Sequence, residues 1–246
     1  SKKIMTMKFL KSVYFLSILL SISSISCDRD DKLDDIIEIT EEEALEMVSN
    51  SLASEAYGIA IQAKDASELV NENKSKTLFN CGVIKSKTIE RNSLPGAVIK
   101  FTHAIDYESS LFCENDLPNG YAIAFKGNGT YESLRLESDD TITYQATLTN
   151  ITNTSENYIY NSSFTRDGTQ ITKIAGRIKN FDSKLTIENK DIVLDKDTLK
   201  ILEGSSTFSL TGTLNTGATF SYSGTVIFQN DIATVTINGN TYKVQI

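Results

Sequence analysis

From Cys81 to the end of the chain, apolar and polar residues alternate with a period of two. This period sends successive side chains to opposite faces of a β-strand, so the region predicts strands. No stretch with a helical period interrupts them, which favours hairpin connections and an antiparallel sheet. The expected strands are GVIKSKTI, AVIKFTHAI, YAIAFK, TYESLRLES, TITYQATLT, YIYNSSFTR, TQITKIAGRIKNF, KLTIEN, SSTFSLTGTLN, ATFSYSGTVIFQ, IATVTIN and TYKVQI.

Turn residues separate these strands, and the alternation within each strand helps to predict the kind of sheet. The apolar members of the later strands share one parity, whereas the opposite positions are mostly Ser and Thr, so one face is expected to be packed and one wet. Segments 169–181 and 217–229 are expected as unusually long strands. A twisted meander, a half-barrel, a closed barrel and a two-sheet sandwich all fit this pattern. Turns are expected at 127–129, 139–140, 167–168, 215–217, 230–231 and 238–240.

The segment before the strands has helical features. Thr40 followed three residues later by Glu43 is a capping box, in which each side chain bonds the other residue's amide. We expect a first helix to about Ser54, with apolar residues on one face, and a second over 57–69, interrupted by Gly58. The sequence therefore predicts an α+β, mainly β fold: an N-terminal helix or helix pair and a large antiparallel β-meander, in a single domain over 40–246.

The first 26 residues are interpreted as a cleaved signal peptide. Four lysines precede an apolar stretch over 13–22, which is too short for a comfortable membrane span, and the small residues SSIS follow. Met7 begins a compact MKFLK leader, so the true start lies either there or near Ser1. An ordinary signal peptide that precedes a cysteine by chance is the alternative.

The stretch Ser24-Ile25-Ser26-Cys27 resembles a lipobox, in which a small residue precedes the cysteine that receives lipid. The common pattern has Leu where Ser24 stands. We therefore expect lipidation of Cys27, followed by an acidic tether over 27–39 whose dense charge keeps it solvated. A calcium-binding loop is not expected here, because Leu33 occupies the position that requires glycine.

Charge and cysteines limit the partners and the compartment. The chain has 24 basic and 32 acidic residues, a net charge of −8; losing the four leader lysines leaves 20 against 32, or −12. Such acidity argues against nucleic acid as a partner. With Cys27 assigned to lipid, Cys81 and Cys113 remain as an even pair, expected to form a disulfide in an oxidising compartment, with two free thiols as the alternative.

Several of these features occur together in a group of Bacteroidota (flavobacterial-type) envelope lipoproteins of unknown function, which the chain resembles. They are the acidic tether, a TEEEALEMV helix, Cys81-Gly82, Cys113 ahead of Pro118, and long hairpins. The acidic residues after Cys27 also resemble the export signal of surface lipoproteins in that phylum. The resemblance implies an outer-membrane location, surface-exposed or periplasm-facing, and no particular activity.

The sequence carries no pattern that specifies a reaction, a cofactor or a metal. His103 is the only histidine and shares the parity of apolar neighbours, so a hydrogen-bonded structural role on the packed face or its rim is expected. No GxSxG motif surrounds a serine. Two carboxylates would suffice for a glycan-active hydrolase. The candidates are Asp106, Glu108, Glu114 and Asp116, although a chain this acidic groups carboxylates by chance.

We therefore expect a non-enzymatic lipoprotein with no cofactor, held to a membrane by lipid on Cys27 and binding an envelope protein or a glycan. A glycan-active hydrolase and a lipid-carrying half-barrel are the alternatives. Asp140-Thr141-Ile142 and Asp197-Thr198-Leu199 resemble O-glycosylation sites of Bacteroidota, which makes Thr141 and Thr198 candidates for modification. The tyrosines that could stack on a sugar are Tyr107, Tyr121, Tyr131, Tyr144, Tyr158 and Tyr160, although tyrosines on strands are more often core residues.

Overall fold

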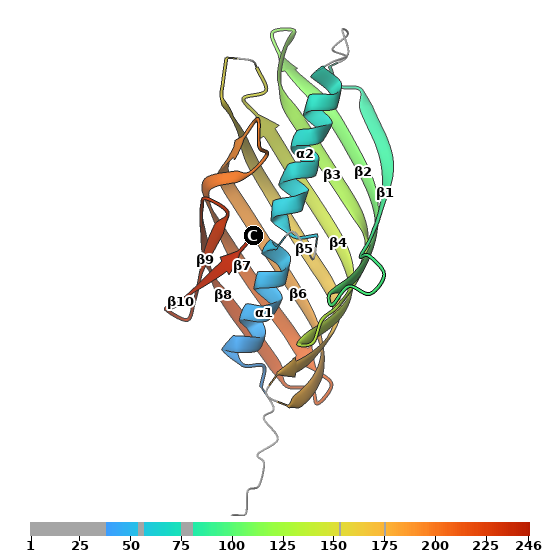
Figure 1. Ribbon diagram of the computed structural model, residues 1–246, viewed down its shortest axis with the longest axis vertical. Coiled ribbons are helices and arrows are strands. Elements are labelled where there is room, and N and C mark those ends of the chain that lie inside the picture. The colour runs from blue at the N-terminus through green and yellow to red at the C-terminus, as the bar shows by residue number, and fades with distance from the viewer. Residues whose placement is uncertain (1–37, 54–56, 75–80, 153, 175) are drawn as a thin grey trace, which may run out of the picture. The chain divides into compact units, whose positions relative to one another are not determined.

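A computed structural model describes residues 38–53, 57–74, 81–152, 154–174 and 176–246, which form two helices followed by ten strands (Figure 1). This order confirms the expected α+β, mainly β fold. The elements are α1 (Glu41–Leu52), α2 (Ile59–Lys74), β1 (Ile84–Asn92), β2 (Lys100–Glu114), β3 (Leu117–Glu132), β4 (Leu136–Thr149), β5 (Asn157–Ile174), β6 (Arg177–Asp195), β7 (Ile201–Leu214), β8 (Thr219–Gln229), β9 (Ile232–Ile237) and β10 (Asn240–Gln245).

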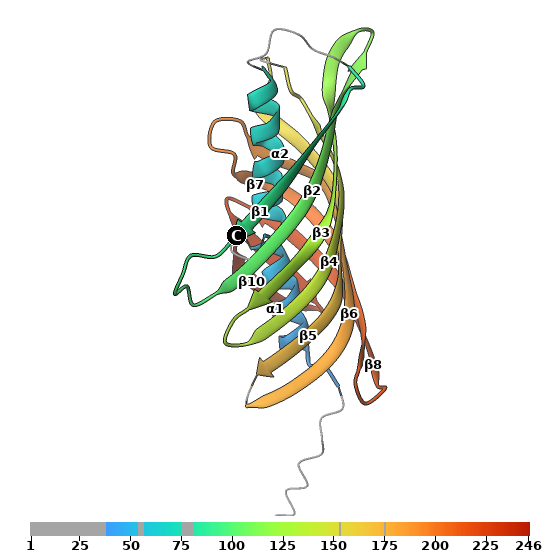
Figure 2. The ribbon, with the colours of Figure 1, turned by 90° about the vertical axis from the view of Figure 1, so that its right-hand side faces the viewer.

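The ten strands form one sheet in which each strand pairs with its neighbour in the sequence. The spatial order is β1 to β10, and the paired strands run antiparallel. Because β1 and β10 lie at opposite ends of this order, the sheet is open, and it is neither a closed barrel nor a two-sheet sandwich. Figure 2 shows that the sheet curls around the helices, so it has a concave inner face and a convex outer face.

Both helices lie along the inner face of the sheet (Figures 1 and 2). The capping box at the start of α1 is confirmed: the Glu43 amide donates to Thr40 Oγ1 at 3.3 Å, and the Thr40 amide donates to Glu43 Oε2 at 2.7 Å. The apolar sides of the two helices are fully buried against the sheet. Their residues with no exposed area include Ala44, Val48, Leu52, Ile59, Ala63, Ala66 and Val70.

Glu43 also joins α1 to β5 and β6, the two central strands of the sheet, close to the hairpin that connects them. Its carboxylate accepts hydrogen bonds from Thr172 Oγ1 on β5 at 2.8 Å and from Lys179 Nζ on β6 at 2.7 Å. Burial raises the pKa of Glu43, but hydrogen bonds from Lys179, Thr40 and Thr172 outweigh that effect and lower the pKa below its usual value. A buried charge needs such partners, so this one carboxylate fixes where α1 begins on the sheet.

Alternation along the strands separates the two faces as expected. On β4 the even-numbered residues from Leu136 to Leu148 are buried under the helices, whereas most of the odd-numbered ones are exposed. The same pattern runs along β5 and most of β6, where it reverses parity at a bulge near Asp191. The outer face is therefore polar, rich in Thr and Ser, and uncovered by any other described element.

Three of the expected turns are wrong, and they fall within strands. Residues 127–129 lie inside β3, 139–140 inside β4 and 167–168 inside β5. The glycines serve close approach between strands: a Cβ on Gly127 would lie 2.1 Å from the Ala104 carbonyl oxygen, and one on Gly168 would lie 2.1 Å from that of Asp139. The actual turns include residues 133–135 and Gly176, inside stretches that the alternation alone assigned to single strands.

The expected turns at 215–217, 230–231 and 238–240 are confirmed, within one residue at the last. The long strand over 217–229 corresponds to β8, whereas 169–181 is a hairpin between β5 and β6. The first helix ends at Leu52 rather than Ser54, and the second runs five residues beyond its expected end.

Replacing Glu43 with alanine should lower the free energy of unfolding by about 3–5 kcal/mol, because Lys179 would stay buried without its partner. Urea unfolding at pH 7 measures this change. The matched control is Glu42→Ala in the same helical turn, where the exposed pair with Arg135 should contribute about 1 kcal/mol or less. Equal losses from the two variants would contradict the role assigned to Glu43.

Candidate functional site

The disulfide expected between Cys81 and Cys113 is present, with 5.8 Å between the two Cα atoms. It joins the residues just before β1 to the far end of β2, and the Gly82 amide donates to the Leu111 carbonyl oxygen beside it at 2.8 Å. Since β1 is an edge strand that pairs only with β2, the bond holds this edge of the sheet in register. Cys27 lies outside the described residues.

A buried polar cluster lies between the α1–α2 junction and strands β1 to β5. In its first part, the Arg166 guanidinium lies 3.3 Å from Asp140, and both side chains are less than a tenth exposed. Gln170 donates to the second oxygen of Asp140 at 2.6 Å, and Arg166 donates to Ser51 on α1 at 3.2 Å. Burial raises the pKa of Asp140, and Arg166 partly offsets that effect.

The second part of the cluster ties α2 to β1. Asp65 accepts a hydrogen bond from the Tyr57 hydroxyl at 2.8 Å and forms an ion pair with Arg91 at 2.5 Å. The Arg91 guanidinium also lies 5.4 Å from the centre of the Tyr57 ring. Burial raises the pKa of Asp65 and, with the nearby Asp65 charge, raises that of Tyr57. These contacts fix the chain at the start of α2.

His103 lies within this cluster and is only 3% exposed, which confirms its expected place on the packed face. Its ring lies 5.2 Å from that of Tyr57 and 5.4 Å from that of Phe101, centre to centre. Neither ring nitrogen has a hydrogen-bond partner among the described residues, so the expectation of a hydrogen-bonded histidine is wrong, because aromatic rings rather than hydrogen-bonding groups lie against the imidazole. Burial, with the charges of Arg166 and Arg91, lowers the pKa of His103 from 6.5 to about 4. The imidazole is therefore neutral at pH 7.

The cluster combines acids, a base and guanidinium groups, yet its arrangement indicates a structural role, which is to hold the helices on the sheet. Its carboxylates are paired with arginines, and Ser51, Tyr57 and Asp65 of the helical segment cover it. A catalytic base must reach the substrate proton, whereas these side chains are directed at each other. Sequence reasoning missed both ion pairs, although one signal was present: Arg166 shares the parity of the buried Tyr160 and Phe164.

The carboxylates considered for hydrolysis are not brought together across a cleft. Asp106 and Glu108 are exposed on the outer face of β2, where Asp106 accepts a hydrogen bond from Thr88 at 2.9 Å. Glu114 ends β2 and accepts from Asn119 at 3.3 Å, while Asp116 lies in the following turn. The four therefore divide between the outer face and one end of the sheet.

A shallow hollow crosses the outer face over β2 to β6. Two neighbouring depressions, of about 550 and 380 Å³, share Glu108, Ala124, Gln145 and Ser163 in their lining. We call them together the outer groove. Its floor is low because Ala122 and Ala124 are small, and its sides carry carboxylates, among them Glu188, which accepts from the Ser163 hydroxyl at 2.6 Å. Its lining combines hydrogen-bonding groups with the apolar atoms of small side chains.

The tyrosines proposed for sugar stacking lie on the other face of the sheet. All six are buried, none more than 5% exposed. Four aromatic rings follow one another beneath the helices, with 4.3 to 6.4 Å between neighbouring centres. They belong to Tyr107, Phe125, Tyr144 and Tyr160. These residues form the core, as tyrosines on strands more often do, so none of the six tyrosines is available to stack on a sugar at the outer groove.

The two candidate glycosylation residues differ in their setting. Thr198 lies in the exposed turn between β6 and β7, where its hydroxyl donates to Asp195 at 2.8 Å. Thr141 was expected at a turn but lies in the middle of β4, exposed on the outer face. Its modification remains a prediction, as does that of Thr198.

The part of the chain that the structure describes has neither a cluster of metal-binding side chains nor a membrane-spanning helix. It contains no group of three or more His, Cys, Asp or Glu side chains placed to hold a metal ion. None of its helices has the length and apolar character needed to cross a bilayer.

Comparison with known proteins gives no further assignment. No family model matches the chain, and neither the curated proteins nor the solved structures contain a significant match to it. Function is therefore inferred from the residues and surfaces described above.

Removing the disulfide with Cys81→Ser and Cys113→Ser together should lower the free energy of unfolding by about 3–4 kcal/mol, from the loop entropy regained by the unfolded chain. Urea unfolding with and without a reductant measures it. The double variant should be insensitive to the reductant. An unchanged midpoint in reduced wild-type protein would show that the bond contributes nothing.

The pKa of His103 predicts a loss of stability in acid. The folded value of about 4 lies below the ordinary 6.5, so between these pH values the unfolded chain binds a proton that the folded protein does not. Stability should therefore fall as pH drops from 6.5 to 4, by up to about 3 kcal/mol from this group. Asp65 and Asp140, whose pKa values are raised, oppose this loss.

Urea unfolding at several pH values measures this slope, and His103→Gln should make it shallower. The chain has no other histidine, so a second imidazole does not contribute. An identical slope in the variant would show that His103 is protonated in the folded protein at the same pH as in the unfolded chain.

Proposed function

We propose that this protein is a non-enzymatic lipoprotein of the bacterial outer membrane, held by lipid on Cys27, that binds an envelope protein or a glycan through the outer face of its sheet. The anchor is supported by the basic leader, the apolar stretch, and the small residues before Cys27. The disulfide between Cys81 and Cys113 is consistent with an oxidising compartment.

The binding proposal rests on one observation: the helices cover the inner face of the sheet, whereas the outer face is open to solvent. The helices fill the inner face with fully buried side chains such as Val48, Ala63 and Val70. The outer face is uncovered among the described residues and bears the outer groove, where Glu108, Gln145 and Ser163 offer hydrogen-bonding groups. Phe125 and Tyr144 also border the groove, but their rings are buried on the inner face, so the described groove presents hydrogen-bonding groups and small side chains to a partner.

The two alternatives find less support in the same geometry. A lipid carrier needs an apolar groove on the inner face, which is where α1 and α2 pack. A carboxylate hydrolase needs two acids flanking the bond to be cleaved. Asp106 and Glu108 lie two residues apart on one strand, side by side along an open face.

The anchor is tested by mass spectrometry of the mature N-terminus and by cell fractionation. Wild-type protein should begin at Cys27, carry lipid and sediment with membranes. Cys27→Ser should be exported unlipidated and released as soluble protein, because the body lacks a membrane-spanning helix among its described residues. An unmodified cysteine in the mature wild-type protein would end the lipoprotein proposal.

Binding at the outer groove is tested with a photo-crosslinking residue at Ala124 in living cells, with Thr211 on the outer face of β7 as the matched site outside the groove. We expect one discrete adduct from position 124 and none from 211. A bulky Ala122→Trp change on the groove floor should abolish it. Adducts of equal yield at both positions, or turnover of glycans by purified protein that Glu108→Gln removes, would contradict the proposal.

A further inference from the structure

Four large apolar side chains project into solvent from three neighbouring hairpins. Of the exposed large apolar side chains in the described part of the chain, these four have the greatest exposure. Leu94 and Val98 lie between β1 and β2, Leu134 between β3 and β4, and Ile178 just inside β6. Their exposed fractions are 81% for Leu94, 76% for Val98, 81% for Leu134 and 70% for Ile178. We call these four residues the apolar rim.

The topology places all four at the same end of the sheet. In an antiparallel meander, alternate hairpins lie at the same end, so the β1–β2, β3–β4 and β5–β6 connections are neighbours. The first of them, Ser93 to Ile99, contains no charged residue. It is built on a turn in which the Ala97 amide donates to the Leu94 carbonyl oxygen at 3.1 Å, with Gly96 at a φ of +80°. The apolar side chains are thus presented by a defined turn.

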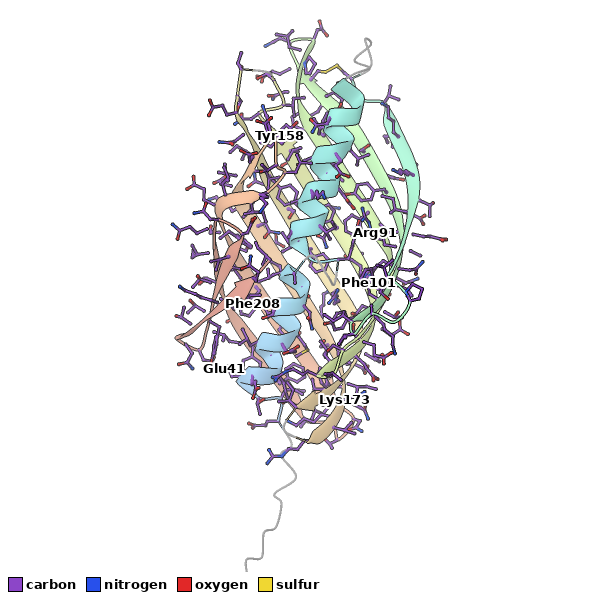
Figure 3. All side chains as sticks on the ribbon, in the orientation of Figure 1. Glu41, Arg91, Phe101, Tyr158, Lys173 and Phe208 are labelled. Atoms are coloured by element: carbon purple, nitrogen blue, oxygen red, sulfur yellow. A yellow bond between two sulfur atoms is a disulfide. The ribbon has the colours of Figure 1, made fainter. Side chains whose placement is uncertain are left out.

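The described chain also begins at this end. Lys179, next to Ile178, donates to the Glu38 carbonyl oxygen at 2.7 Å. Arg135, next to Leu134, pairs with Glu42 at 2.5 Å and Glu46 at 2.9 Å in the first turns of α1. Figure 3 shows Glu41 and Lys173 at this end and Tyr158 toward the opposite one. Two of the three hairpins of the rim therefore contact either Glu38 or the first turns of α1.

The turns at the opposite end of the sheet are polar or acidic: Asn115-Asp116 between β2 and β3, residues 196–198 between β6 and β7, and Asn230-Asp231 between β8 and β9. Exposed apolar side chains occur at that end as well, at the first residues of β3 and β1, where Leu117 is 69% and Ile84 is 65% exposed. Single exposed apolar residues are common on protein surfaces and need no explanation. The four residues of the apolar rim are more exposed than Leu117 and Ile84, and they lie at the end of the sheet where the described chain begins.

We propose that the apolar rim is a second membrane contact, which dips into the bilayer interface and orients the body on the membrane that holds Cys27. This inference rests on the proposed lipid anchor. Ten residues separate Cys27 from Glu38, and ten residues of any chain span at most about 35 Å, so the proposed anchor limits how far the rim can lie from the lipid surface. Because the protein is already tethered, insertion of the rim is an intramolecular step with a high effective concentration. A rim too weak to bind the membrane alone can then spend much of its time inserted.

The charge of the protein predicts which lipids suit the rim. Without its leader the chain has a net charge of −12, from 20 basic and 32 acidic residues, so a strongly anionic surface should repel it. Insertion of aliphatic side chains depends instead on apolar burial at the interface. Zwitterionic phosphatidylethanolamine and phosphatidylcholine should therefore support the contact better than bilayers rich in anionic lipid.

The absence of tryptophan from the chain gives a clean test. A single tryptophan is introduced as Val98→Trp or as Leu134→Trp. Leu117→Trp is the matched control, since Leu117 is 69% exposed at the start of β3, at the opposite end of the sheet. The chain from Cys27 onward is coupled through that thiol to a maleimide lipid in vesicles of phosphatidylcholine and phosphatidylethanolamine. Coupling by chemistry makes the result independent of whether cells lipidate Cys27.

We expect brominated lipids to quench the fluorescence of the Val98→Trp and Leu134→Trp proteins several-fold more strongly than that of the Leu117→Trp control, with a blue shift of emission. Val98→Asp in the Leu134→Trp protein should reduce the quenching, whereas Leu117→Asp should not. Equal quenching at both ends would overturn the proposal. So would a blue shift that occurs without vesicles and grows with protein concentration, since that would identify a second copy of the chain as the occupant of the rim.

Discussion

A single buried carboxylate, that of Glu43, determines how the helices sit on the sheet. It caps the first turn of α1, accepts from Thr172 on β5 and pairs with Lys179 on β6. A charge that is removed from water must keep every one of these partners, so the helix start has one allowed position on the sheet. The buried cluster at the α1–α2 junction repeats this principle with Asp140–Arg166 and Asp65–Arg91.

The edge of the sheet beside α1 is held by a related set of contacts. Glu41 accepts hydrogen bonds from Tyr242 at 2.5 Å and from Asn240 at 2.8 Å, both on β10, and from Asn238 in the turn before it at 3.1 Å. The opposite edge is held by the disulfide at Cys113. An open sheet exposes two edge strands that can pair with other chains. This protein therefore ties one edge to a helix and fixes the other covalently.

Filling the inner face has a direct consequence for function, because it leaves the outer face and the ends of the sheet as the surfaces open to partners. The outer groove offers hydrogen-bonding groups over small side chains. The apolar rim offers aliphatic side chains at the end where the described chain begins. These two surfaces differ in chemistry and suit different partners, a polar one for the groove and a lipid interface for the rim.

Features of the candidate site could be predicted where they depend on residue counts or on the alternation within one strand, and could not where they depend on the pairing of two strands. The disulfide followed from the number of cysteines, and the buried place of His103 followed from its parity with Phe101 and Ile105. The ion pair between Asp140 and Arg166 was missed, because two adjacent acids at 139–140 have the local composition of a turn. Only the pairing of β4 with β5 brings Asp140 beside Arg166.

The sequence by itself determined the class of fold, the capping box at Thr40 and which face of most strands is buried, because these depend on periodicities and contacts within a few residues. The tertiary structure alone decided that the sheet stays open, that the helices fill its inner face, and where the first hairpins turn. Glycines 127 and 168 illustrate the reason: they resemble turn residues locally, but they are needed because neighbouring strands approach too closely for a Cβ atom. Such close approach exists only once strands far apart along the chain have been brought together.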